Sequence, residues 1–529
     1  MLRFDPQRLQ SLRPCYVNVN KKLCRTEERL FFILCLKLES IPLLSFEFEN
    51  LSELVEEQGV KSMQKPMRTL VSLAVVTMLA NTAAHAGGFS LYTEASGAAI
   101  GNYAAGIAAE GADASIGWYN PAGLVLIHQQ QAVFSGVGVF PSSKLTGTST
   151  FVTTTGEPPQ VLPAYTQRFS GLQGGKNAFV PSFHYALPLG DRATFGFSVV
   201  SPFGLSTEYD QNSPVRYAAT YSELLTVNVS PELGAKLTDN FSVGAGLDLQ
   251  WAQVKFNRML GAPTLLQYSR VYPFSYDSLS YNKGHSLGVG FHAGVMTMFN
   301  DNHTRVGLNY QSSVEHKFHG YSQLSGRLAD PDLMDMATVR SNSLSSNNIK
   351  LPKIVTLSGY QDINNKLALL GSVVYSGWNS FKTIQLNNVA AFSASTPSPQ
   401  ILVNSTSAQN FRNAWRVALG ANYHVNEQWM MRVGGGYDQT PTVNAERDVR
   451  LPDANRWALS VGTHYQMRPN IGFDLGYTYL FASKDPIVNK TDLFGTTSTY
   501  NVNARADVHA HLVGLQAVWI IDQDQYTTK

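Results

Sequence analysis

Residues 241–252, FSVGAGLDLQWA, alternate strictly between apolar side chains and side chains that are polar or glycine. The odd positions hold Phe241, Val243, Ala245, Leu247, Leu249 and Trp251. The even positions hold Ser242, Gly244, Gly246, Asp248 and Gln250. Because successive side chains of a β-strand point to opposite faces, this period of two predicts a strand with one apolar and one polar face.

The same alternation recurs along the chain. In 456–466, Trp457, Leu459 and Val461 oppose Arg456 and Ser460, and 471–481 repeats the pattern. Together these segments predict about fourteen strands, an even number that leaves both termini on the periplasmic side of an outer-membrane barrel. They lie near 131–140, 178–188, 193–201, 222–237, 241–256, 285–299, 303–317, 350–361, 366–378, 412–424, 428–438, 455–466, 469–481 and 508–520.

The spacing of the segments separates a membrane barrel from a soluble β-sandwich, which alternates in the same way. Short turns such as PLGDR, TDN, NDNH, DINN, VNEQ and MRPN alternate with long connections at 257–284, 319–349 and 379–411. Short turns at one end and long loops at the other are typical of bacterial outer-membrane barrels. No stretch of 18 or more apolar residues follows Gly87. The predicted fold is an all-β, transmembrane antiparallel β-barrel.

The composition excludes two classes of protein. The 529 residues are 44% hydrophobic and 15% charged, with a formal net charge of +2. This is too apolar for a disordered chain and too balanced for an electrostatic nucleic-acid binder. The cysteines Cys15, Cys24 and Cys35 all precede the barrel, so it can hold neither a disulfide nor a cysteine metal site.

Residues 63–86, MQKPMRTLVSLAVVTMLANTAAHA, have the three parts of a secretory signal peptide. Lys65 and Arg68 are basic, 70–80 is apolar but too short to span a bilayer, and 84–86 forms an A-x-A cleavage site. The alternative is an internal buried helix. We expect translation to begin at Met63 or Met67, which makes 1–62 a start-site artefact, and the mature chain to begin at Gly87.

Residues 87–128 lie between this signal and the predicted barrel at 129–520, and 521–529 forms a polar tail. The segment 87–128 is rich in Gly and Ala and lacks sustained alternation. It is predicted to fold as an N-terminal hatch, or plug, within the lumen. Asn120-Pro121 would be the rigid break that ends the plug and leads into the first strand. Residues 367–378 and much of 508–520 are apolar on both faces, which suits an apolar cargo.

Six motifs follow one another along the chain: GGFSLYTEASG (87–97), NPAGL (120–124), SPFGLSTEYD (201–210), SPELGAKLTDNFSVGAGLDL (230–249), LPKIVTLSGY (351–360) and DQTPTVNAERDVRLPDANRWALSVGTHY (438–465). In this order they resemble the FadL family of outer-membrane long-chain fatty acid and hydrocarbon transporters. The resemblance runs from Gly87 to about Trp519. It implies a 14-stranded barrel with an N-terminal hatch, an extracellular groove, a hydrophobic pocket and a lateral exit at a kink in the third strand. The resemblance also implies that no energy source is coupled to the movement of the ligand.

The resemblance also implies ligand-binding and gating residues. Phe89 resembles an aromatic residue that touches the acyl chain, with a plain plug anchor as the alternative. Asn120, Pro121 and Ala122 match the hatch motif, which would also be explained by a structural turn. Ser201 and Phe203 fall at the kink. Strict alternation of side chains along the strand puts Ser201 on the lipid face unless Pro202 bends the strand.

Arg456 falls on the polar face of its strand, where a charge points into the lumen. It matches the arginine of the family's PD-x-D-R motif, which helps to bind the fatty acid carboxylate. The arginine guanidinium can donate two parallel hydrogen bonds to such a carboxylate. The equal alternative is an internal salt bridge to a lumen acid such as Asp474. The family pattern has an acidic residue at the position of Asn455. The sequence therefore leaves open which acidic residue pairs with Arg456.

No catalytic group, cofactor or metal is predicted. His509 and His511 share a face of the last strand without a third ligand. The prediction is therefore a monomeric barrel of the Gram-negative outer membrane that carries long-chain fatty acids or a similar apolar ligand passively. Its other partners would be outer-membrane lipid and the barrel-assembly machinery, and not nucleic acid. A hydrocarbon channel is the alternative, ahead of a lipid-acting enzyme or an adhesin.

Overall fold

The computed structural model describes residues 88–156, 159–392, 400–495 and 497–521. The predicted signal peptide, the extension before it and the polar tail beyond Ile521 lie outside the described residues. None of the described helices is long and apolar enough to cross a membrane.

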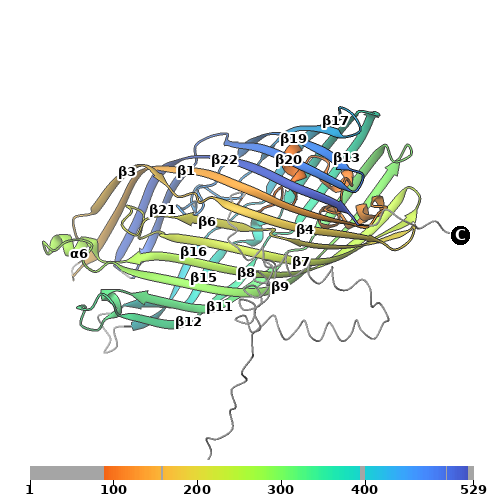
Figure 1. Ribbon diagram of the computed structural model, residues 1–529. Coiled ribbons are helices and arrows are strands. Elements are labelled where there is room, and N and C mark those ends of the chain that lie inside the picture. Colours follow the sequence, from red (N-terminus) through yellow and green to blue (C-terminus); the bar gives the residue numbers. More distant parts are fainter. Residues whose placement is uncertain (1–87, 157–158, 393–399, 496, 522–529) are drawn as a thin grey trace, which may run out of the picture. The chain divides into compact units, whose positions relative to one another are not determined.

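Fourteen antiparallel strands close into a barrel within this part of the chain, as the alternation predicts (Figure 1). Each overlaps one predicted segment. The barrel strands are β1 (Gln131–Thr155), β4 (Ala178–Pro188), β5 (Ala193–Val200), β7 (Tyr221–Thr238), β8 (Phe241–Leu260), β9 (Ser278–Phe299), β10 (Thr304–Gln311), β13 (Ile354–Asn364), β14 (Leu367–Ser376), β17 (Ala414–His424), β18 (Trp429–Asp438), β19 (Arg456–Arg468), β20 (Ile471–Ala482) and β22 (Ser498–Ile520). The barrel closes where β1 pairs with β22, with Gln131 opposite Ile520.

The long connections between the barrel segments contain further strands, which the side-chain alternation did not predict. These strands extend the barrel wall beyond the short-turn half, and their side chains are largely polar. Because their outer faces meet water, they carry little apolar alternation from which a strand could be recognised. They are β2 (Gln160–Val161), β3 (Tyr165–Gln173), β6 (Gly204–Glu208), β11 (Glu315–Ser325), β12 (Val339–Lys350), β15 (Thr383–Phe392), β16 (Gln400–Ala408) and β21 (Ile487–Phe494). The helical turn α6 (Pro263–Tyr268) lies between β8 and β9, η3 (Arg327–Ala329) lies between β11 and β12, and η4 (Trp378–Ser380) lies between β14 and β15.

The outer face of the barrel is apolar and bounded by aromatic pairs. On β19, Leu459 is 62% exposed whereas its neighbour Ala458 is 2% exposed. Trp429 packs on Tyr465 at the turn end of β18 and β19, and Tyr437 packs on Trp457 at the other end. At about 3.3 Å per residue and a tilt of about 40°, the rise between these pairs is about 20 Å, close to the apolar band of an outer-membrane barrel.

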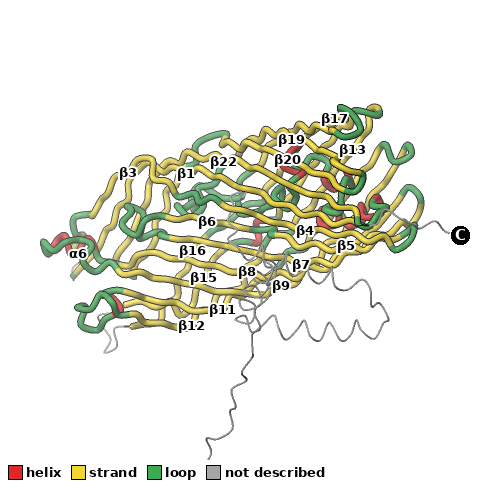
Figure 2. The backbone as a smooth tube through the Cα atoms, in the orientation of Figure 1, coloured by secondary structure: helices red, strands yellow, loops and turns green. Residues whose placement is uncertain are grey.

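The plug fills the barrel lumen (Figure 2). It consists of η1 (Ala98–Asn102), α4 (Ile107–Glu110), α5 (Ile116–Tyr119) and η2 (Pro121–Leu126). Between Gly88 and Ile127, Ala112 alone is exposed. Leu370 of β14 and Leu512 of β22 belong to the same buried cluster as the plug residue Ile100. These two leucines therefore pack against the plug, whereas Val374 on the same inward face of β14 belongs to the buried cluster of Phe89 and Trp378.

Glycines of the barrel wall allow the plug backbone to approach closely. A Cβ atom on Gly244 of β8 would lie 2.3 Å from the carbonyl carbon of Pro121. A Cβ on Gly434 of β18 would lie 2.3 Å from the carbonyl oxygen of Asn102, and one on Gly514 of β22 would lie 2.5 Å from that of Gly97. Only glycine leaves room for backbone at these positions.

Candidate ligand-binding and gating site

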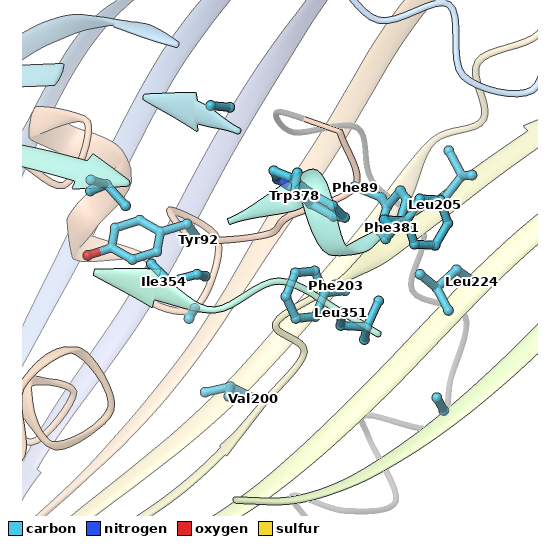
Figure 3. Close-up of a cluster of buried hydrophobic side chains, with 14 of the residues drawn as sticks. Phe89, Tyr92, Val200, Phe203, Leu205, Leu224, Leu351, Ile354, Trp378 and Phe381 are labelled. Atoms are coloured by element: carbon cyan, nitrogen blue, oxygen red, sulfur yellow. The ribbon is translucent and has the colours of Figure 1, made fainter. Parts of the chain in front are cut away.

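Phe89 lies at the centre of a buried aromatic cluster inside the barrel (Figure 3). Its ring centroid is 4.6 Å from that of Trp378, 5.4 Å from Phe381, 6.2 Å from Phe411 and 6.4 Å from Phe203. Most of these contacts are edge-to-face, the arrangement that aromatic quadrupoles favour. We call this packed cluster the aromatic chamber, and its apolar side chains suit contact with an acyl chain or a hydrocarbon.

The chamber is built from breaks in the barrel strands. Phe203 lies between β5 and β6, Trp378 and Phe381 lie between β14 and β15, and Phe411 lies between β16 and β17. At each break the chain leaves the wall and brings a large side chain into the lumen. The sequence analysis missed Trp378, Phe381 and Phe411 because it placed them in a strand end and in loops. The sequence feature that could have identified them is an aromatic residue at the boundary of an alternating segment.

The N-terminal segment pairs with the break in the third strand. Ser90 forms an antiparallel bridge with Phe203. The backbone N–H of Leu91 donates to the carbonyl of Pro202 at 2.9 Å, and the N–H of Gly204 donates to the carbonyl of Phe89 at 2.9 Å. The start of the plug and the kink are thereby held together as two short strands.

The kink also turns Ser201 away from the lipid face on which strict parity places it. Ser201 is fully buried, and its Oγ donates to the carbonyl of Thr226 on β7 at 2.7 Å. Phe203 is fixed by the Thr226 hydroxyl, which accepts from its N–H at 2.9 Å and donates to its carbonyl at 2.6 Å. The hydroxyl of Ser201 is thus engaged by backbone.

Arg456 is buried at the start of β19 and faces the lumen. Its Nε and Nη2 donate to Oδ2 of Asp438 at 3.2 and 3.0 Å, and its Nη1 lies 3.8 Å from Oδ1 of Asp453. Asp474 is the wrong partner, because Asp438 is the residue directly opposite Arg456 across the strand pair. Asn455 takes no part in this charge pairing: its Oδ1 accepts from the N–H of Thr440 at 3.0 Å.

The sequence analysis did not find Arg416, a second buried arginine beside Arg456. Arg416 lies on the lumen side of β17, where its guanidinium stacks 3.9 Å from the ring centroid of Tyr103. Its Nη2 donates to the Tyr103 carbonyl, and its Nη1 has no hydrogen-bond partner among the described residues. Arg416, Arg456 and Trp378 line the same cavity. In the predicted strand 412–424, the alternation of side chains places Arg416 on the inward face, and this position could have identified it.

Asn120 joins two helical turns of the plug to the barrel wall. Its Nδ2 donates to the carbonyls of Ala108 at 2.8 Å and Val295 of β9 at 3.2 Å, while its Oδ1 accepts from the N–H of Ala122 at 3.2 Å. Pro121 then opens η2, a position that suits its fixed φ and missing N–H. The prediction that the motif ends the plug is wrong, because η2 continues it before β1 begins at Gln131.

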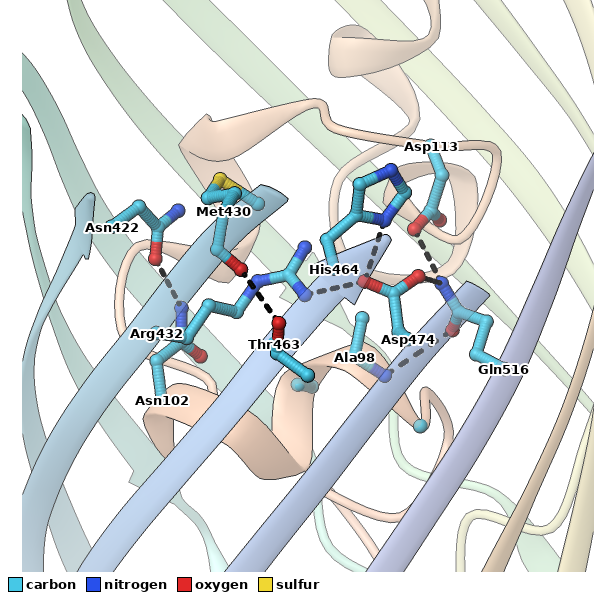
Figure 4. Close-up of polar contacts among 12 residues, drawn as sticks. Ala98, Asn102, Asp113, Asn422, Met430, Arg432, Thr463, His464, Asp474 and Gln516 are labelled. Carbon is cyan, nitrogen blue, oxygen red and sulfur yellow. Dashed lines mark hydrogen bonds and ion pairs between the residues drawn. The ribbon is translucent and has the colours of Figure 1, made fainter. Parts of the chain in front are cut away.

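A polar network fastens the plug to the opposite wall (Figure 4). Asp474 of β20 pairs with Arg432 of β18, and its Oδ1 also lies 2.9 Å from Nδ1 of His464. The side chain of Gln516 on β22 donates to Oδ2 of Asp474 at 3.3 Å and to Oδ2 of the plug residue Asp113 at 2.7 Å. Buried polar groups of this kind are retained when they are mutually satisfied.

His509 and His511 lie in an aromatic stack on the last strand. The ring of His511 is 5.0 Å from that of Tyr479, and its Nδ1 is 2.8 Å from the hydroxyl of Tyr477. Across the described ranges no three His, Cys, Asp or Glu side chains are grouped so that they could hold a metal ion.

A closed barrel with an apolar outer band, an internal plug and a buried apolar chamber defines the class of plugged outer-membrane barrels. The chain belongs to the family described as outer membrane protein transport protein (OMPP1/FadL/TodX), whose model matches residues 77–519. It is a protein of the Gram-negative outer membrane, with both barrel termini on the periplasmic side. The family is one of transport proteins.

Individual relatives agree with this assignment. The chain is 27% identical over 441 residues to a long-chain fatty acid transport protein of Escherichia coli O6:H1, covering 80% of this chain and 93% of that protein. The crystal structure of a Pseudomonas aeruginosa FadL homologue matches with a TM-score of 0.67 at 25% identity, covering 82% of this chain and all of that one (100%). The Pseudomonas putida toluene transporter TodX shares the fold, with a TM-score of 0.55 at 13% identity and coverage of 83% and 99%.

Proposed function

We propose that this protein carries long-chain fatty acids across the outer membrane. The observation that carries the proposal is the cavity in which Arg416 and Arg456 adjoin the aromatic chamber of Phe89 and Trp378. A fatty acid needs both an apolar site for its chain and a cation for its carboxylate. Since Arg456 is engaged by Asp438, the unpartnered Nη1 of Arg416 is the donor that we assign to the carboxylate.

The N-terminal segment would couple ligand binding to the plug. An acyl chain that enters the chamber must displace Phe89, whose carbonyl holds the kink through Gly204. We propose that this releases the pairing between the plug and the kink and opens a lateral exit at Pro202. A cavity lined by Pro202, Phe203 and Trp118 lies on this route. In this proposal residues 87–128 act as a hatch, and Asn120, Pro121 and Ala122 hold its closed position.

The transport would be passive, without a cofactor or a catalytic step. We assign the exposed apolar band to contact with outer-membrane lipid, and we expect folding by the barrel-assembly machinery and a monomeric state. The plug already closes the lumen within one chain, so no second subunit is needed to seal it.

The test measures binding of oleate and of oleyl alcohol, which lacks the carboxylate, to the purified barrel. We expect Arg416→Gln to weaken oleate binding about 10- to 100-fold, since a hydrogen bond to a charged group is worth about 1.5–3 kcal/mol. Binding of oleyl alcohol should be unchanged. Uptake of labelled oleate by cells without their own fatty acid transporter should fall in parallel.

Arg412→Gln is the matched control, because the Arg412 side chain donates to the Thr440 carbonyl and to Oδ1 of Asn455, and Arg412 does not line the cavity of Arg416 and Arg456. Equal affinity of the wild type for oleate and oleyl alcohol, together with unaltered oleate binding by Arg416→Gln, would contradict the carboxylate site. It would favour the alternative of a hydrocarbon channel, for which the aromatic chamber of Phe89 provides the physical basis. Toluene uptake would then be the next measurement.

A further inference from the structure

The lipid-facing surface changes abruptly from apolar to cationic on β8 and β9. Along the outer face of β9, Phe291, Val289 and Leu287 are exposed and apolar, and the next outward positions are His285 and Lys283. On β8 the outward Trp251 is followed by Gln253 and Lys255. These cations lie on the side of the apolar band away from the short turns, which is the extracellular side.

The strand register gathers these cations on one area of the outer wall. Lys255 of β8 lies directly opposite Lys283 of β9, and His285 of β9 lies directly opposite His319 of β11. Lys317 is the neighbouring outward residue on β11 and is exposed. The strands β8, β9 and β11 run side by side in Figure 1. We call Lys255, Lys283, His285, Lys317 and His319 the outer cationic patch.

The acids near the patch neutralise one of its lysines and leave the others without a carboxylate partner. Glu223 of β7 pairs with Lys255, with the two charged atoms 2.8 Å apart. Glu315 of β11 lies 3.9 Å from Lys350.

The side chains of Lys283, Lys317, His285 and His319 make no hydrogen bond, ion pair or ring contact with any described residue. Lys283 lies directly opposite Lys255, and because like charges opposite each other across a strand pair are unfavourable, an anion beside Lys283 would stabilise this pair further.

We propose that the outer cationic patch binds the phosphate groups of a phosphorylated glycolipid in the outer leaflet. A lipid whose acyl chains lie against Leu287 and Val289 places its headgroup at the level where the cations begin. The lysines provide charge, and the imidazole N–H groups provide further donors for phosphate oxygens. Beside them the stacked rings of Tyr281 and Tyr321, 5.8 Å apart, offer a flat surface to a sugar ring. This site is separate from the lumen and independent of the transported molecule.

The test titrates purified lipid A onto the full-length barrel in mild detergent and measures bound lipid by native mass spectrometry. We expect the double variant Lys283→Gln, Lys317→Gln to bind lipid A about 10- to 30-fold more weakly, because each basic residue near an anionic lipid surface contributes about 1 kcal/mol. The double variant Lys283→Arg, Lys317→Arg should retain binding. The control is Lys236→Gln, Lys366→Gln, which removes two lysines at the turn end of the barrel.

Two comparisons decide whether phosphate on a glycolipid is what binds. Wild-type protein should bind fully dephosphorylated lipid A at least tenfold more weakly than lipid A. It should also bind phosphatidylglycerol more weakly than lipid A. Equal binding of lipid A by the wild type and the double glutamine variant would overturn the proposal, as would equal binding of the dephosphorylated lipid or of phosphatidylglycerol.

Discussion

Gly244→Ala should displace the plug without altering the barrel wall. The added methyl group would lie 2.3 Å from the carbonyl carbon of Pro121 and 2.4 Å from the nitrogen of Ala122. Ordinary carbon contacts are about 3.5–4.0 Å, so one side must move by about 1 Å. Gly244 pairs with Gly234 on one side and Gly294 on the other, so the wall is held and the plug moves.

The size of the effect follows from the cost of overpacking. A methyl group forced into a filled interior costs about 1–3 kcal/mol. If that cost falls on the closed plug alone, the open population rises about 5- to 150-fold, at about 1.4 kcal/mol for each factor of ten. The reporter is Ser115→Cys, a buried plug position in a barrel that has no cysteine of its own. Its labelling by a polar maleimide should accelerate by that factor.

Gly359→Ala is the matched control for this measurement. Gly359 lies on another barrel strand, and a Cβ there meets nothing within 4 Å. Both variants exchange a strand glycine for alanine, so the change in strand propensity is shared. If Gly244→Ala labels no faster than Gly359→Ala, the glycines do not hold the plug and the argument from close backbone packing is wrong.

Three further results are expected. Asn120→Ala removes three hydrogen bonds and should destabilise the closed plug by about 1–3 kcal/mol, which hydrogen exchange would register as faster exchange in 107–122 with unchanged barrel strands. Arg432→Gln removes the arginine partner of the buried Asp474 and leaves only His464 beside it, which should cost about 3–5 kcal/mol of stability, measured by thermal unfolding. A second change, Asp474→Asn, should recover part of this loss, and no recovery would argue against the ion pair. Intact-mass measurement of the mature protein should give a chain that begins at Gly87, and peptides from 1–62 in the precursor would contradict the predicted start site.

The alternation of side chains predicted every barrel strand because lipid contact is a local property. A residue that faces lipid must be apolar whatever lies across the strand, so Leu459 and Val461 indicate a lipid face from the sequence alone. The short turns and the small residues of the plug, which suit a confined lumen, are also local features that the sequence shows. Beyond the lipid this alternation ends, so the sequence predicts long connections where the outer strands β15 and β16 lie.

Side chains along a single strand therefore indicate which of its faces meets lipid, and the composition of 87–128 indicates a segment of small residues before the barrel. The contacts inside the barrel follow instead from how the strands pair and close. The partner of Arg456 is Asp438 because of strand register, and Arg416 gains its place beside them from barrel closure. Phe89 meets Trp378 and Phe411 because breaks in three distant strands converge on the plug. Such contacts depend on the pairing of remote segments, which periodicity along one strand does not encode.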